Sequence, residues 1–200
     1  MKQVIAVFCL LFFAALPVRS RAAEPTESLR GPIDGIINLL KDPQYQDEAK
    51  KKEQTDKIWK ILREIFDFDR ISKLCLAAYW KDFNEKQLKE FTDLFTDLLG
   101  DTYLKKIQAE YKNEKVIYLS QEIGSDSNSD KAQVKTKIIR ENIEIPVDYS
   151  MWLNKGDWRV YDVKVEGVSL VKNYRNQFQK ILLNKSPDHL IEKLKNKLKD

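Results

Sequence analysis

One stretch of this 200-residue chain, residues 145–178, restricts the possible folds more than any other. From residue 145 to residue 153 every second residue is apolar, which is the period of a strand with one buried face. Residues 155–157, Lys-Gly-Asp, favour a turn because glycine adopts positive φ freely. From Val168 onward apolar residues recur at helical spacing, and Ser169 can cap that helix. The stretch therefore predicts a hairpin that leads through a corner into an amphipathic helix packed on its own sheet.

The second strand of this hairpin is predicted from strict alternation of its side chains. One face is expected to carry Trp158, Val160 and Asp162, and the other Tyr161, Val163 and Val165. Asp148 and Asp162 are then expected to face each other across the hairpin. We interpret them as a solvated polar pair rather than as catalytic groups.

Helical patterns occupy the first half of the chain. Apolar spacing predicts helices over residues 26–40 and 46–64, and a third that begins near Asp67 or Asp69. Residues 84–87, Asn-Glu-Lys-Gln, resemble a capping box that opens the longest helix, which is expected to run to about residue 111. Gly100 interrupts that helix and predicts a kink or a close contact there.

Two further strands are predicted over residues 116–123 and 132–138, on either side of a serine-rich turn. With the hairpin they make a four-stranded antiparallel meander, and a last helix is expected from Ser186. The predicted fold class is therefore α+β, with the helices on one side of the sheet.

The first 22 residues predict a secretory signal peptide. A short positive segment precedes an apolar run of 15 residues, 4–18, and small residues follow at 20–22. Fifteen residues are short for a membrane span, so cleavage after Ala22 is the preferred interpretation. We expect residues 23–200 to form a single exported domain.

Removal of this signal changes the charge and the cysteine count. The 35 basic residues become 32 against 31 acidic residues, so the net charge of about +1 gives no reason to expect a nucleic-acid partner. Cys75 becomes the only cysteine, and it lies in an apolar helical pattern. We therefore predict a buried small hydrophobic side chain rather than a nucleophile.

Catalytic motifs are missing from the sequence. His189 is the single histidine, and no Gly-x-Ser-x-Gly, His-Glu-x-x-His, Cys-x-x-Cys or phosphate-binding glycine loop occurs. We expect neither an enzyme nor a metal site. What the chain has in excess is apolar and aromatic surface, which forms either a solid core or a core opened around a ligand.

Several segments resemble those of a known family. They are residues 156–158, 160–162, 165–171, 174–175 and 178 around the hairpin, and residues 66–69, 88–95, 103, 147–149 and 188–191 elsewhere. On these segments the chain resembles the MlaC family, also called the toluene-tolerance family. It departs from the family at Ala77-Ala78, where members commonly carry a Leu-Gly pair.

The resemblance implies a periplasmic phospholipid carrier. Such carriers exchange lipid between an inner-membrane ABC transporter, through its MCE-domain protein, and an outer-membrane lipoprotein–porin complex, and so maintain the lipid asymmetry of the outer membrane. The implied fold is a twisted antiparallel sheet wrapped by helices, like the cone of nuclear transport factor two. The resemblance further implies a monomer without a cofactor, with phospholipid bound as cargo between sheet and helices.

Carried over residue by residue, the resemblance implies an acyl-chain pocket. The hairpin and the helix after it contribute Tyr149, Met151, Val163, Val165, Val168, Leu170, Val171 and Phe178. The earlier helices contribute Ile33, Ile37, Leu94, Leu98 and Tyr103.

Two other functions stay open at this point. A small-molecule enzyme on the same cone fold requires titratable groups inside the cavity, and an interaction module with a solid core binds no ligand. A face that carries Lys131, Lys135 and Lys137 is a candidate docking stripe, although a solvated sheet face has the same pattern.

Overall fold

The computed structural model describes residues 23–125 and 128–199, so the predicted signal peptide lies outside the described residues. The α-helices are α1 (Pro25–Lys41), α2 (Glu48–Ile65), α3 (Phe68–Leu76), α4 (Glu85–Leu99), α5 (Lys105–Glu110), α6 (Leu170–Leu182) and α7 (Pro187–Lys197). Short 3-10 turns η1 (Pro43–Gln46) and η2 (Ala77–Asp82) and a π-turn η3 (Gly100–Leu104) join some of them. Within the described residues, none of the helices combines the length and the hydrophobicity that a membrane span requires.

Side-chain caps fix where these helices begin. The Asn84 side chain accepts from the amide of Gln87 at 2.9 Å, and the Gln87 side chain accepts from the amide of Asn84 at 3.0 Å. This is the predicted capping box. Asp67 caps α3 and Ser169 caps α6, so the predicted starts of these helices are also confirmed.

The strands form one antiparallel sheet in the order β1 (Lys115–Ile123), β2 (Lys131–Arg140), β3 (Ile143–Asn154), β4 (Asp157–Val165) and β5 (Val168–Ser169). The α+β class is confirmed, but the prediction of four strands omitted β5. Glu166 and Gly167 have φ of 50° and 80°, which turns the chain back so that Val168 pairs with Val165. Two residues are too few for alternation to reveal a strand. The likeness to the nuclear-transport-factor-two cone stays a prediction.

A β-bulge at Tyr161 changes which side chains of β4 share a face of the sheet, so the predicted alternation along this strand is wrong. Met151 pairs with Val160 and Ser150 with Asp162, so Tyr161 is an extra residue in this strand. Val160 and Val163 consequently lie on the same face of the sheet, and both pack in the same core as α1. Asp162 faces Ser150 and not Asp148, which pairs instead with Lys164.

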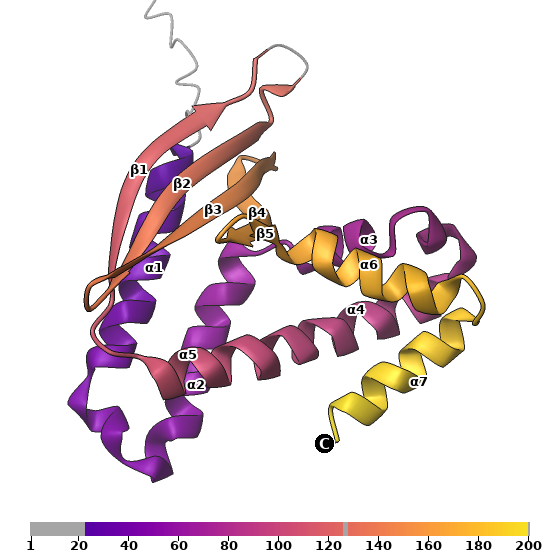
Figure 1. Ribbon diagram of the computed structural model, residues 1–200, viewed down its shortest axis with the longest axis horizontal. Coiled ribbons are helices and arrows are strands. Elements are labelled where there is room, and N and C mark those ends of the chain that lie inside the picture. Colours follow the sequence, from indigo (N-terminus) through magenta and orange to yellow (C-terminus); the bar gives the residue numbers. More distant parts are fainter. Residues whose placement is uncertain (1–22, 126–127, 200) are drawn as a thin grey trace, which may run out of the picture.

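Two main apolar cores lie side by side (Figure 1). The sheet core packs α1 against the sheet and consists of Leu29, Ile33, Ala132, Val134, Met151, Trp158 and Val160. The helical core joins α3, α4, α6 and α7, and its buried aromatic residues are Phe83, Phe91, Phe95, Tyr174 and Phe178. A smaller cluster of Leu40, Ile58 and Leu104 links α1, α2 and the end of η3. α1 thus covers one face of the sheet, and the helices α3, α4, α6 and α7 lie beside its β4–β5 end (Figure 1).

The predicted longest helix is observed as α4, η3 and α5 in succession from Glu85 to Glu110, with the π-turn beginning at Gly100. A Cβ at this position would lie 3.0 Å from the ring of Trp59, so the absence of a side chain lets α2 approach closely. The interruption that the sequence predicted at Gly100 is confirmed, with a close contact as its cause.

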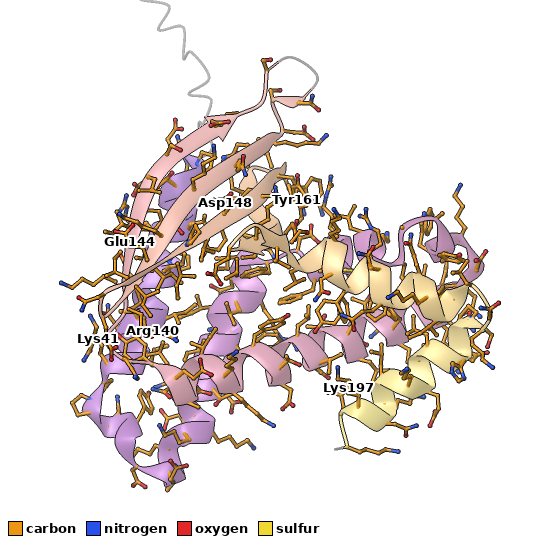
Figure 2. The ribbon with its side chains drawn as sticks, viewed as in Figure 1. Lys41, Arg140, Glu144, Asp148, Tyr161 and Lys197 are labelled. Carbon is orange, nitrogen blue, oxygen red and sulfur yellow. The ribbon has the colours of Figure 1, made fainter. Side chains whose placement is uncertain are left out.

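A buried ion pair closes the end of the sheet where α5 leads into β1. Glu114 is 7% exposed and accepts from the Arg140 guanidinium at 2.6 Å and from the amide of Lys112 at 2.7 Å. Arg140 is labelled in Figure 2. Burial raises the pKa of Glu114, but these hydrogen bonds and the charge of Arg140 outweigh it and hold that pKa below its usual value.

We predict that Glu114→Gln lowers the free energy of unfolding by about 2 kcal/mol at pH 7, because Arg140 loses the nearer of its two carboxylate partners and keeps only Glu110, 3.6 Å away. The lowered pKa stabilises the fold above the unfolded-state value of about 4.3, and this contribution is lost as the pH falls through the folded-state pKa. The difference between variant and wild type should therefore shrink at about pH 3 in urea unfolding.

The matched control is Glu141→Gln, because Glu141 lies 3.4 Å from Lys112 in an exposed pair. It should change the free energy of unfolding by less than about 0.5 kcal/mol. Equal losses in the two variants would contradict a special role for Glu114.

Candidate functional site

The thirteen residues expected to line an acyl-chain pocket fall into three groups. The first group belongs to the sheet core: Ile33 and Met151 are buried in it, and Ile37, Tyr149 and Val163 pack against it. The antiparallel register explains the sheet members, since Tyr149 pairs with Val163 and Met151 with Val160 on the face that α1 covers. These five side chains are brought together by the structure.

The second group belongs to the helical core. Leu98, Val171 and Phe178 are buried there, and Leu94 and Leu170 pack against them. Phe178 contacts Phe91 and Phe95 with ring centroids 5.4 and 5.1 Å apart, close to the preferred edge-to-face distance. These five residues come together too, but in a different core from the first group.

The third group is exposed. Val165 and Val168 are cross-strand neighbours, 44% and 64% exposed, and we call them the apolar corner. Tyr103 is 39% exposed on η3 and lies next to Tyr174. The apolar corner lies in sequence between Val163 of the first group and Leu170 of the second. That all thirteen residues line one lipid pocket stays a prediction.

A polar joint connects the sheet to the helical layer. Phe66 forms a β-bridge with Val160, and the amide of Asp67 donates to the carbonyl of Val160 at 2.9 Å. The guanidinium of Arg159 donates to the carbonyls of Phe66 at 2.8 Å and Arg63 at 2.9 Å, which satisfies the end of α2. The α2–α3 connection is thereby held along β4.

Two carboxylates complete this polar joint. Asp67 accepts from the indole of Trp152 at 2.9 Å and from the amide of Arg70. Asp162 accepts from the Ser169 hydroxyl at 2.6 Å and from the amide of Val171 at 3.0 Å, so it holds the first turn of α6 against β4. The sequence analysis missed this role because strict alternation placed Asp162 on the wrong face.

Two tyrosines place polar atoms beside the sheet core. The Tyr118 hydroxyl is buried and makes no hydrogen bond within the described part of the chain. Burial raises the pKa of Tyr149 to about 12, and burial is also the main cause of the raised pKa of Tyr118. Both phenols are therefore neutral at ordinary pH and can donate a hydrogen bond to an oxygen atom of a ligand.

A cavity of about 490 Å³ lies between α2, α3, α4 and the end of the hairpin. Its polar side chains are those of Arg63, Asp67, Asp69, Thr92, Asp93, Thr96, Asp97, Asn154 and Arg159. Asp67 and Arg159 are occupied by the polar joint, and Arg63 lies 3.5 Å from Asp97. Most of this cavity is thus lined by groups that hold the fold together.

A second cavity of about 300 Å³ lies between α4, α6 and α7. Leu98 and Phe178, both expected in the acyl pocket, are on its floor, and three lysines surround it: Lys180, Lys193 and Lys197. The sequence analysis did not single out these lysines. Their signal was the helical spacing of Leu190, Lys193, Leu194 and Lys197 on one face of α7.

The candidate docking stripe on β2 is neutralised by its neighbours. Lys135 lies 3.1 Å from Glu122, and Lys137 lies 2.8 Å from Glu144, which is labelled in Figure 2. Lys131 donates to the side chain of Asn128 at 3.1 Å. The stripe is therefore a paired, solvated sheet face rather than a concentration of free positive charge.

Titratable groups do not gather into a catalytic constellation in the part of the chain that the structure describes. That part holds no group of three or more His, Cys, Asp or Glu side chains able to bind a metal ion. Cys75 is a buried free thiol whose Sγ lies 3.8 Å from the carbonyl oxygen of Val171, and burial raises its pKa to about 12. Its predicted burial is confirmed.

The geometry defines a class: an α+β protein in which an antiparallel sheet and a helical layer, each with its own apolar core, are joined by polar contacts. Comparison with known sequences agrees. The family model for MlaC protein matches residues 32–196. The chain belongs to the MlaC family.

Relatives are distant in sequence. The toluene tolerance protein ttg2D of Pseudomonas putida is 26% identical over 172 residues, which cover 84% of this chain and 78% of that protein. The intermembrane phospholipid transport system binding protein MlaC of Haemophilus influenzae is 29% identical over 123 residues, 60% of this chain and 56% of that protein.

A solved structure shares the fold. The phospholipid-binding protein from Ralstonia solanacearum, determined in complex with a phospholipid, superposes with a TM-score of 0.75 at 20% identity. The match covers 88% of this chain and 97% of that one.

We predict that Cys75 resists alkylation by iodoacetamide at pH 8 in the folded protein, because its thiol is buried and protonated. In denaturing urea it should react as an ordinary cysteine with a pKa of about 8.5. Peptide mapping by mass spectrometry measures modification at Cys75 itself. Equal rates in the two conditions would contradict the buried, neutral thiol.

Proposed function

We propose that this protein is a phospholipid carrier of the periplasm. Membership of the MlaC family supports this proposal, as do a relative named for intermembrane phospholipid transport and a shared fold with a phospholipid complex. The protein is exported as a monomer, takes phospholipid as its cargo and needs no cofactor.

The observation that carries the proposal is the apolar corner. Val165 and Val168 pair across neighbouring strands and so expose a contiguous apolar surface, and contiguous apolar surface indicates a site for a ligand or a partner. Val165 continues the strand that carries Val163 in the sheet core, and Val168 leads into Leu170 and Val171 at the helical core. Acyl chains that enter at this corner reach the apolar side chains of both layers.

The energetics suit carriage without chemistry. A diacyl phospholipid hides roughly 30 methylenes, each worth about 0.8 kcal/mol in transfer from water, so about 25 kcal/mol must be matched by apolar protein surface. In this proposal the acyl chains lie between sheet and helices, and the hydroxyls of Tyr118 and Tyr149 supply hydrogen bonds to lipid oxygens. The headgroup stays near solvent.

The same proposal assigns partners. The carrier exchanges lipid between the MCE-domain protein of an inner-membrane ABC transporter and an outer-membrane lipoprotein–porin complex, and thereby maintains lipid asymmetry. Because an apolar pocket favours neither membrane, the direction of net transfer is set by these partners and not by the carrier.

We predict that protein purified from its native compartment carries phospholipid in native mass spectrometry, and that organic extraction releases it. The mass difference gives the number of lipids per chain. A chain without any bound molecule would instead support a ligand-free interaction module, and a different small molecule would support an enzyme.

We predict that Val168→Glu reduces co-purified phospholipid roughly tenfold or more, because bound acyl chains would have to cover an unpaired carboxylate. Val168 is 64% exposed, so the variant should fold with an unchanged melting temperature. Lipid per folded chain is measured after extraction.

The matched control is Leu183→Glu, because Leu183 is 66% exposed but lies at the end of α6 away from the corner. It should retain lipid as the wild type does. Normal retention by Val168→Glu, or equal loss in the two variants, would contradict the entry site at the corner.

A further inference from the structure

The cavity between α4, α6 and α7 combines an apolar floor with a rim of lysine side chains. Its floor is apolar, and five of its side chains are at most 5% exposed: Leu98, Tyr174, Phe178, Leu190 and Leu194. Figure 1 shows that α7 diverges from α4 toward the C-terminal end of α7. No residue of the sheet contributes to its lining.

The rim of this cavity carries free positive charge. Lys180 comes from α6, and Lys193 and Lys197 come from α7; Lys197 is labelled in Figure 2. None of the three has an ion-pair or hydrogen-bond partner among the described residues. Lysines close by are paired instead: Lys195 lies 2.7 Å from Glu90, and Lys89 lies 2.6 Å from Asp93.

The size of the cavity limits what it can hold. A cavity of about 300 Å³ is at the small end of the range of about 300–1,000 Å³ typical of small-ligand sites, which suits a ligand with one acyl chain better than one with two. The ammonium groups at its rim lie at the surface, where the head of such a chain would emerge, and each can donate three hydrogen bonds to an anion.

We propose that this cavity is a site for a single-chain anionic amphiphile, with the acyl chain on the floor of Leu98, Phe178 and Leu194 and the anionic head between Lys180, Lys193 and Lys197. The head is a carboxylate, as in a fatty acid, or a phosphate, as in a lysophospholipid. This site lies between α4, α6 and α7, away from the apolar corner, and its floor includes Leu98 and Phe178, which the family resemblance also assigns to the acyl-chain pocket.

Three probes with the same chain test the proposal by calorimetric titration of the full chain, below the concentrations at which they form micelles. They are palmitate, palmitoyl lysophosphatidylglycerol and palmitoyl lysophosphatidylcholine, the last with no net charge. We expect the anionic probes to bind about tenfold more tightly than the zwitterionic one at low salt, and this preference to fall as salt is added. If palmitate is the only anionic probe that binds, the site accepts a carboxylate head; if lysophosphatidylglycerol is the only one, it accepts a phosphate head. Binding of both supports a site for either kind of anionic head.

The rim is tested by the triple variant Lys180→Gln, Lys193→Gln and Lys197→Gln. It should lose the tenfold preference for anionic probes. The matched control replaces Lys60, Lys86 and Lys172, three exposed lysines on α2, α4 and α6 outside the cavity lining, by glutamine. Because it removes the same net charge, it separates contact with the head from a general effect of charge.

The floor is tested by Gln177→Trp, which places a large side chain over the cavity from its exposed edge without changing a buried residue. This variant should weaken binding of all three probes at least tenfold, whereas Val168→Glu should leave that binding unchanged. Wild-type binding by the triple lysine variant or by Gln177→Trp would overturn the proposal. Loss of diacyl lipid in Val168→Glu tests only the carrier function, so the two proposals fail separately.

Discussion

The arrangement of this protein depends on the short polar joint that β4 makes with the helical layer. Val160 bridges Phe66, Arg159 satisfies the last carbonyls of α2, and Asp162 holds the first turn of α6. These contacts come from three residues of one strand, Arg159, Val160 and Asp162. Together with Phe66, which packs against both cores, they fix how the sheet core and the helical core are placed relative to each other.

The polar joint has an energetic consequence. A hydrogen bond contributes about 1 kcal/mol net, whereas complete burial of one large apolar side chain contributes about 1.5–3 kcal/mol. Each core buries many such side chains, so a rearrangement that changes the angle between sheet and helices is less costly than one that opens either core. A carrier of the proposed kind needs this property, because lipid must enter and leave without unfolding the protein.

Local patterns allowed much of the fold to be predicted. The capping box at Asn84, the caps at Asp67 and Ser169, and the alternation in β3 are set by neighbours in sequence, and all were predicted. The bulge at Tyr161 was not predicted, because the sequence of β4 was interpreted as a simple alternation, whereas the pairing of β4 with β3 shifts by one residue there. One extra residue reversed the predicted faces of Trp158 and Val160 and hid the role of Asp162.

The candidate site was harder to predict for a related reason. Helical and strand periods identify which side chains are apolar on one face, but they do not say which faces meet. Ile33 and Leu98 have the same kind of pattern, yet they belong to different cores. Similarly, sequence shows that lysines are numerous, but only the structure distinguishes the paired Lys135 and Lys137 from the free Lys193 and Lys197.

The buried titratable groups beside the two cores all shift in one direction. Burial is the main cause of the raised pKa of Cys75, Tyr118, Tyr149 and Tyr174, so each is neutral at ordinary pH. A general acid or base works best when its pKa lies near the pH of the reaction, and none of these four groups meets that requirement. When an acyl chain enters a neutral interior, no charged group has to lose its hydration. The phenols still offer hydroxyl groups to ester or phosphate oxygens. These groups would be uncharged near pH 7 even at their ordinary pKa, and burial raises the pKa of each further, so a lipid bound beside them as proposed would meet no charge.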